Sequence, residues 1–176
     1  EAELAAIMSA EIIAQGALPG FVVVTSGERS ALADAYATTR RLSAHDILRI
    51  DIGCRLNGYW SDTARSAFVG EPSTDALAAF TATAAGQDAG RRLGGPGLPG
   101  YRRHHVGHGL GIESHEYPTI SASNGVILEP GMVLCIEAPY YRPGWGGGMT
   151  EDTLLVTEDG AELFTHLPRA PCIIAA

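Results

Sequence analysis

The sequence predicts an α+β fold, in which helices pack outside an antiparallel sheet. Short β-branched runs separated by glycine, proline and asparagine turns indicate strands, and two other segments have helical patterns. A chain of 176 residues with 45% hydrophobic composition is long enough to bury one core. We therefore expect a single domain over residues 1–176.

The chain opens with a predicted helix over residues 1–15. Its apolar residues recur at helical spacing, at Leu4, Ile7, Met8, Ile12 and Ile13. Gly16 and Pro19 end this pattern, and the β-branched run 21–25 that follows predicts a strand.

Residues 47–69 predict a β-hairpin, because two strand patterns flank the turn pair Asn57-Gly58. A two-residue turn sets the register, so positions 53 and 62 face each other. Asp51 then lies on the same face as Asp62, with Cβ atoms roughly 7 to 8 Å apart. Two carboxylates at this separation can bind one ion or two adjacent ions, although a surface turn with two aspartates fits this hairpin equally well.

A second helix is predicted over the alanine-rich stretch 75–92, capped by Ser73 or Thr74 and ended by a break at 94–97. The later part predicts a loop or strand at 106–112, and strands at 132–140 and 150–156 that pair across a glycine-rich turn. Two carboxylate-bearing hairpins in one chain indicate pseudo-two-fold symmetry.

Charge and hydropathy exclude several classes of partner. The net charge is −8 and all 12 basic residues are arginine, which disfavours a nucleic-acid surface. No stretch approaches the roughly 20 apolar residues of a membrane span, and none resembles a signal peptide, so we expect a cytosolic (cytoplasmic) protein. Three cysteines without close spacing predict reduced thiols.

Two glutamates and one histidine occupy positions that metal binding would explain. Glu137 lies inside an apolar strand, where an ionised carboxylate is costly unless it is paired or bound to metal. Glu151 begins the next strand, and glycines flank His108, which allows close backbone approach. His104 and His105 have the pattern of ordinary packed or solvent-exposed histidines.

These motifs resemble those of the pita-bread metallopeptidases, which include methionine aminopeptidases, prolidases and Xaa-Pro aminopeptidases. The matching pieces, in family order, are Ile50–Gly53 with Ser61–Thr63, Gly107–Gly111 with His115–Glu116, Leu128–Met132 with Ile136–Glu137, and Thr150–Thr153 with Val156–Thr157. The resemblance covers nearly the whole chain and implies the pita-bread (creatinase/aminopeptidase-like) fold. The segments 113–118 and 151–160 are most similar to the Xaa-Pro branch.

The resemblance also implies a site and a reaction. It implies two divalent metal ions held by Asp51, Asp62, His108, Glu137 and Glu151. Glu137 would handle the proton of the attacking water, and His115 would contact the substrate. Such donors suit manganese, cobalt, zinc or iron. The expected activity is cleavage of an amide bond in a peptide or small amide, as an Xaa-Pro aminopeptidase or dipeptidase, and relatives lead us to expect a homodimer.

Departures from the family keep other functions open. Asp34 stands where the family usually has a catalytic-site histidine, which makes it a candidate substrate-binding residue with different chemistry. Met149 stands where many prolidase-like members have an arginine. We also expect a shortened segment around 75–104 and no separate amino-terminal domain. The alternatives are a creatinase-like C–N hydrolase of a small metabolite and a binding module that has lost catalysis.

Some residues have two interpretations. Aromatic residues near the glycine-rich turn either pack at strand ends or line a substrate pocket: Tyr140, Tyr141 and Trp145. Cys135 shares strand parity with Glu137, so it is either an inert buried thiol or a neighbour of the metal ions. Arg65 is predicted to form an ion pair.

Overall fold

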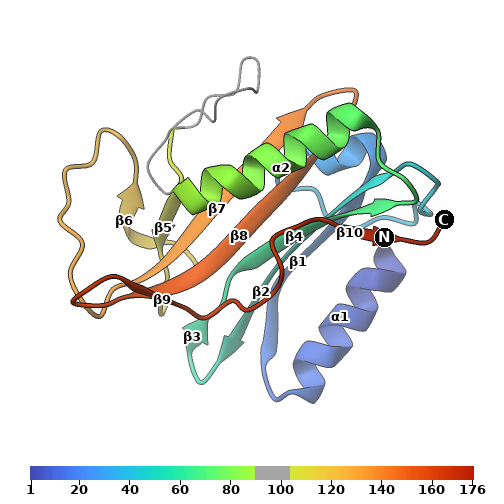
Figure 1. Cartoon of the computed structure of the whole chain (residues 1–176). Coiled ribbons are helices and arrows are strands. Elements are labelled where there is room, and N and C mark those ends of the chain that lie inside the picture. The colour runs from blue at the N-terminus through green and yellow to red at the C-terminus, as the bar shows by residue number, and fades with distance from the viewer. Residues whose placement is uncertain (90–103) are drawn as a thin grey trace.

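The computed structural model describes residues 1–89 and 104–176, and it confirms the α+β class (Figure 1). Each predicted helix and strand has a counterpart, while β6, β9 and β10 match no predicted strand. The elements are α1 (Ala2–Ala14), β1 (Leu18–Ser26), the 3-10 helix η1 (Gly27–Ala31), β2 (Ile47–Leu56), β3 (Tyr59–Trp60), β4 (Thr63–Val69), α2 (Thr74–Ala89), β5 (Gly107–Gly109), β6 (Glu116–Ile120), β7 (Val133–Arg142), β8 (Gly146–Val156), β9 (Ala161–Leu163) and β10 (Cys172–Ile174).

The strands form one sheet in the order β1-β2-β4-β8-β7-β5-β6, and β3, β10 and β9 pair beside β2, β4 and β8. The pairs along this path are antiparallel, whereas β10 runs parallel to β4. Two hairpins, β2–β4 and β7–β8, meet where Ala64 pairs with Glu151. The observed order agrees with the predicted antiparallel sheet and with two carboxylate-bearing hairpins related by pseudo-symmetry.

The two helices cover different parts of the sheet (Figure 1). Met8 of α1 packs against the buried cluster that contains Leu48 of β2. Phe80 of α2, which lies across β7 and β8, meets Phe68 edge to face at a centroid distance of 4.9 Å. Because side chains alternate along a strand, Asp51 points away from the face of β2 that α1 covers.

The first hairpin has the predicted register. Asn57 and Gly58 have positive φ values of 52° and 91°, as the tight turn requires, and Leu56 pairs with Tyr59. The strand is interrupted at residues 61–62, but position 52 still pairs with position 63 beyond the interruption. Asp62 therefore keeps its predicted place diagonal to Asp51 while lying in a break between β3 and β4.

The second hairpin pairs Glu137 directly with Glu151. Its β8 strand begins at Gly146, so the predicted glycine-rich turn is wrong in position: these glycines belong to the strand. The reason is packing, because a Cβ at Gly148 would overlap the ring of Phe80. Glycine lets the strand pass close beneath α2.

Predictions about α2 are tested only in part. Ser73 is its cap, because Ser73 Oγ accepts a hydrogen bond from the backbone N–H of Ala76 at 3.2 Å. The helix is described as far as Ala89. Its predicted end at residue 92, the break at 94–97 and part of the segment around 75–104 lie outside the described residues.

The predictions of reduced thiols and of an ion pair at Arg65 are confirmed. Cys54, Cys135 and Cys172 are free cysteines. Arg65 forms an ion pair with Asp152. Over the ranges 1–89 and 104–176, none of the helices is long and apolar enough to cross a membrane.

Candidate metal centre

A cavity of about 390 Å³ lies at the junction of the two hairpins. Every residue that the sequence proposed for the site lines this cavity. The full lining is Phe21, Val23, Ala33, Asp34, Tyr36, Asp51, Asp62, His105, His108, His115, Glu137, Tyr141, Met149 and Glu151. Segments from both halves of the chain therefore build one site.

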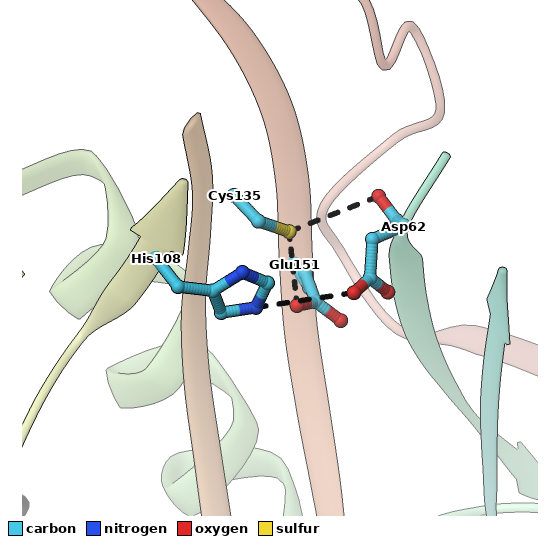
Figure 2. Close-up of side chains that lie close together, drawn as sticks. All are labelled: Asp62, His108, Cys135 and Glu151. Atoms are coloured by element: carbon cyan, nitrogen blue, oxygen red, sulfur yellow. Dashed lines mark hydrogen bonds and ion pairs between the residues drawn. The ribbon is translucent and has the colours of Figure 1, made fainter. Parts of the chain in front are cut away.

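Four buried side chains form its tightest group, with one ligand atom from each lying within 4.8 Å of the others (Figure 2). They are Asp62, His108, Cys135 and Glu151. Cys135 is fully buried, and its thiol donates a hydrogen bond to Glu151 Oε1 over 3.0 Å. Cys135 therefore lies beside the candidate ligands, and it is also a buried thiol whose pKa burial raises, so that the two interpretations hold together.

Asp51 and Glu137 line the same cavity but lie outside this group of four. Glu137 pairs with Glu151 across β7 and β8, and Glu137 Oε1 lies 3.3 Å from His105 Nε2. Asp51 pairs with Ala64, whose neighbour on β8 is Glu151. The sheet thus brings all the predicted ligands to one cavity, and Glu151 is paired with strands of both hairpins.

Within the part of the chain that the structure describes, three buried carboxylate oxygens have no hydrogen-bond partner: Asp51 Oδ1, Asp62 Oδ1 and Glu151 Oε2. Burial raises the pKa of Asp51 to about 6 and the pKa of Asp62 to about 8, and repulsion from Glu137 adds to both. Burial and the neighbouring carboxylates also raise the pKa of Glu151 well above its usual value. Buried acids that repel one another and lack partners are costly unless a cation joins them.

His108 offers one ring nitrogen to this group. Its Nδ1 lies 3.0 Å from the Gly109 carbonyl and is therefore assigned as the N–H donor, which leaves Nε2, 3.9 Å from Asp62 Oδ2, as an acceptor. Burial lowers the pKa of His108, which favours the neutral imidazole that binds metal. His115 stacks on the His108 ring at a centroid distance of 3.8 Å.

The structure bears on the predictions for His105 and for the aromatic residues near the glycine-rich turn. His105, predicted to be an ordinary histidine, lines the cavity and approaches Glu137. No local pattern reveals this, because only the pairing of β5 with β7 brings His105 there. Tyr141 also lines the cavity, whereas Tyr140 and Trp145 pack against the core.

The sequence interpretation missed Arg49, which is fully buried. Its guanidinium donates to the carbonyls of Leu32 and Ala33, at 2.8 and 2.6 Å, and to the Tyr141 hydroxyl at 2.6 Å. These contacts hold the loop that brings Asp34 to the cavity. An arginine within an apolar strand pattern was the available signal, because such a charge requires buried partners.

The donors in the cavity fit divalent ions. Buried carboxylates with free oxygens and a neutral imidazole match the ligand preferences of borderline and hard divalent metals. An antiparallel sheet that buries such donors around one cavity forms a candidate metal centre. The chain belongs to metallopeptidase family M24, whose family model matches residues 1–102 and 93–158.

Similar proteins agree with this membership. The chain is 37% identical over 194 residues to the probable dipeptidase PepE of Mycobacterium tuberculosis, covering 99% of this chain and 52% of that protein. It is 34% identical over 170 residues to the Xaa-Pro dipeptidase of Pyrococcus furiosus, covering 86% of this chain and 49% of that protein.

Solved structures agree as well. The crystal structure of dipeptidase PepE from Mycobacterium ulcerans matches with a TM-score of 0.94 at 33% identity, covering 100% of this chain and 53% of that one. The predicted family, its Xaa-Pro branch and the pita-bread fold are therefore confirmed. The chain spans about half the length of these relatives.

Proposed function

We propose that this chain is the catalytic unit of a metal-dependent peptidase that hydrolyses Xaa-Pro peptides. The proposed holders of its two divalent ions are Asp51, Asp62, His108, Glu137 and Glu151. The observation that carries the proposal is the set of three buried, unpartnered carboxylate oxygens in one cavity with the His108 imidazole. Family membership and relatives described as dipeptidases and Xaa-Pro dipeptidases support the reaction class.

Divalent ions, when bound, polarise a scissile carbonyl and lower the pKa of water. The side chains of the cavity supply the remaining chemistry. We assign Glu137 as the base that accepts a proton from the attacking water and returns it to the leaving nitrogen; His105 Nε2 lies 3.3 Å from its Oε1. Cys135 holds Glu151 Oε1, which leaves Glu151 Oε2 free to act as a ligand.

The walls of the cavity suit a proline-containing substrate. Phe21, Tyr141 and Met149 supply apolar surface for a pyrrolidine ring. His115 is exposed beside the His108 ring and is the proposed substrate contact, as the sequence predicted. Asp34 is the second proposed substrate contact.

Metal analysis with a peptide assay tests the proposal. Protein purified without chelator should contain about two divalent ions per chain. Asp62→Ala should lose them, whereas Glu162→Gln, a change at an exposed position in β9, should not. Xaa-Pro dipeptides and longer Xaa-Pro peptides should be cleaved when Mn²⁺ or Co²⁺ is added.

Each outcome separates the proposal from an alternative. Cleavage that follows the metal content supports a peptidase. Metal without cleavage of any peptide would redirect the search to small C–N bonded metabolites. Failure to bind metal under any loading condition would contradict the site and favour a binding module.

A further inference from the structure

The cavity contains one carboxylate more than the proposed metal site uses. Two divalent ions would offset the charges of Asp51, Asp62, Glu137 and Glu151, which leaves Asp34. Among the described residues, Asp34 has no hydrogen bond or ion pair, and the described lining contains no arginine or lysine. The charge of Arg49 also acts on this site, but its guanidinium donates hydrogen bonds elsewhere, so the Asp34 carboxylate would stay unpaired in the loaded cavity.

The position of Asp34 is built into the fold. Asp34 is exposed and lines the cavity together with Asp51. The carbonyls of Leu32 and Ala33, immediately before it, accept hydrogen bonds from the fully buried Arg49. Asp34 is thus anchored through β2, the strand that carries Asp51.

The cavity beside Asp34 also has apolar walls. Its lining includes Phe21, Val23 and Met149, which can pack along an aliphatic chain. A ligand with an aliphatic stem and a positive end would contact these walls and the Asp34 carboxylate, while the unpartnered oxygens of Asp62 and Glu151 stay with the proposed metal ions.

We propose that Asp34 selects substrates that carry a positively charged group on an aliphatic stem, such as a lysine-like side chain. The inference rests on the proposed function, because it names the substrate class of the same cavity. The Asp34 carboxylate pairs with the substrate cation and the apolar walls pack on its stem. The size of the selection is about fivefold, because a partly exposed ion pair contributes up to about 1 kcal/mol.

Paired peptides measure this selection. In peptide amides of the form Xaa-Pro-Yaa, lysine is compared with norleucine, its uncharged straight-chain counterpart, at the first and at the third position. Assays at about pH 8 keep ordinary imidazoles neutral. The metal-loaded wild type should favour lysine at one of these positions by about fivefold in kcat/KM, and added salt should reduce the preference.

Asp34→Asn should abolish the preference for lysine, so that the ratio of kcat/KM between the lysine and norleucine peptides falls from about fivefold to about one. Glu162→Gln, which removes a charge away from the cavity lining, should retain the preference. Cleavage with equal lysine preference in the wild type and Asp34→Asn would overturn the inference and leave the proposed function intact.

Calorimetry covers the case in which neither peptide is cleaved. Binding of lysinamide and norleucinamide is then measured on the metal-loaded wild type and Asp34→Asn. Tighter binding of lysinamide to the wild type alone would support the inference although the proposed function had failed. Equal binding of both amides to both proteins would overturn it.

Discussion

The two carboxylate-bearing hairpins place their acidic groups in different ways. In β2–β4, Asp51 and Asp62 are diagonal neighbours, and Asp62 lies in the break between β3 and β4. In β7–β8, Glu137 and Glu151 pair directly within continuous strands. The longer glutamate side chains reach the cavity from a regular ladder, whereas the shorter aspartate at position 62 reaches it from an interrupted strand.

The surroundings of these acids differ as well. Glu151 lies at the junction of the hairpins, with β4 on one side and β7 on the other, and only 2% of it is exposed. Asp51 is half-buried and lies outside the tight group that contains Glu151. Each hairpin therefore supplies one donor to the tight group, Asp62 or Glu151, and one donor outside it, Asp51 or Glu137. The first hairpin also carries the loop contacts of Arg49.

The largest expected effect compares a donor inside the tight group, Glu151, with a donor outside it, Asp51. Glu151→Gln should weaken binding of Mn²⁺ by more than about 100-fold, beyond the range for groups that only support a ligand. Asp51→Asn should weaken it less, because Asp51 lies outside the tight group. Calorimetric titration and elemental analysis measure both, with Glu162→Gln as the control. Equal losses from both variants would contradict the distinction.

The next effect concerns the pH dependence of stability in the metal-free protein, to which both hairpins contribute because Asp51, Asp62 and Glu151 all have raised pKa values. The folded-state pKa values of Asp51 and Asp62, about 6 and about 8, exceed the ordinary value of about 4 in the unfolded chain. Between these values the folded state binds more protons, so stability should fall as pH rises from about 4 to about 8.

Urea unfolding in the presence of chelator, at about pH 5 and about pH 8, measures this fall. Asp62→Asn should flatten the dependence, because it removes the group with the more strongly raised pKa. Saturating Mn²⁺ should reverse it, because metal binds the ionised carboxylates. A stability that does not change with pH in chelator would contradict the repulsion argument.

A smaller effect tests the contact between the two hairpins at Ser66 of β4 and Met149 of β8. Ser66 Oγ accepts a hydrogen bond from the Met149 N–H at 2.8 Å and donates one to the Met149 carbonyl at 3.1 Å. Ser66→Ala leaves both buried groups unpaired and should lower the free energy of unfolding by about 1 to 3 kcal/mol. Ser123→Ala, at an exposed position, is the matched control for urea unfolding. Equal free energies of unfolding for the two variants would show that this contact adds little to stability.

The smallest expected effect compares the turns of the two hairpins, at Gly58 and Gly144. Gly58 and Gly144 have φ values of 91° and 76°, and a Cβ at either position would meet no neighbour. Alanine at each should cost about 1 kcal/mol in the free energy of unfolding, because only the backbone conformation is strained. Gly125→Ala, in equally open space without a positive φ, should cost less. A larger loss from one turn would show that the hairpins depend on their turns unequally.

Much of the site followed from local sequence. The Asn57-Gly58 turn allows one hairpin register, and that register places Asp51 and Asp62 on one face. Glu137 and Glu151 could be selected because an ionised glutamate in an apolar strand needs a partner, and the order of motifs predicted the family that the comparisons confirm. Metal identity, the homodimer and a cytosolic location stay predictions.

Only the tertiary structure decided which donors lie closest together and what else shares their cavity. Cys135 joins the tight group because β7 and β8 pair in a register that brings its thiol to Glu151. His105 and Arg49 enter through contacts between segments far apart in the sequence. The sequence by itself therefore determined the ligand candidates and the fold class, because strand period and turn chemistry are local. Long-range pairing of the two hairpins determined the cavity, because no local pattern encodes which strands meet.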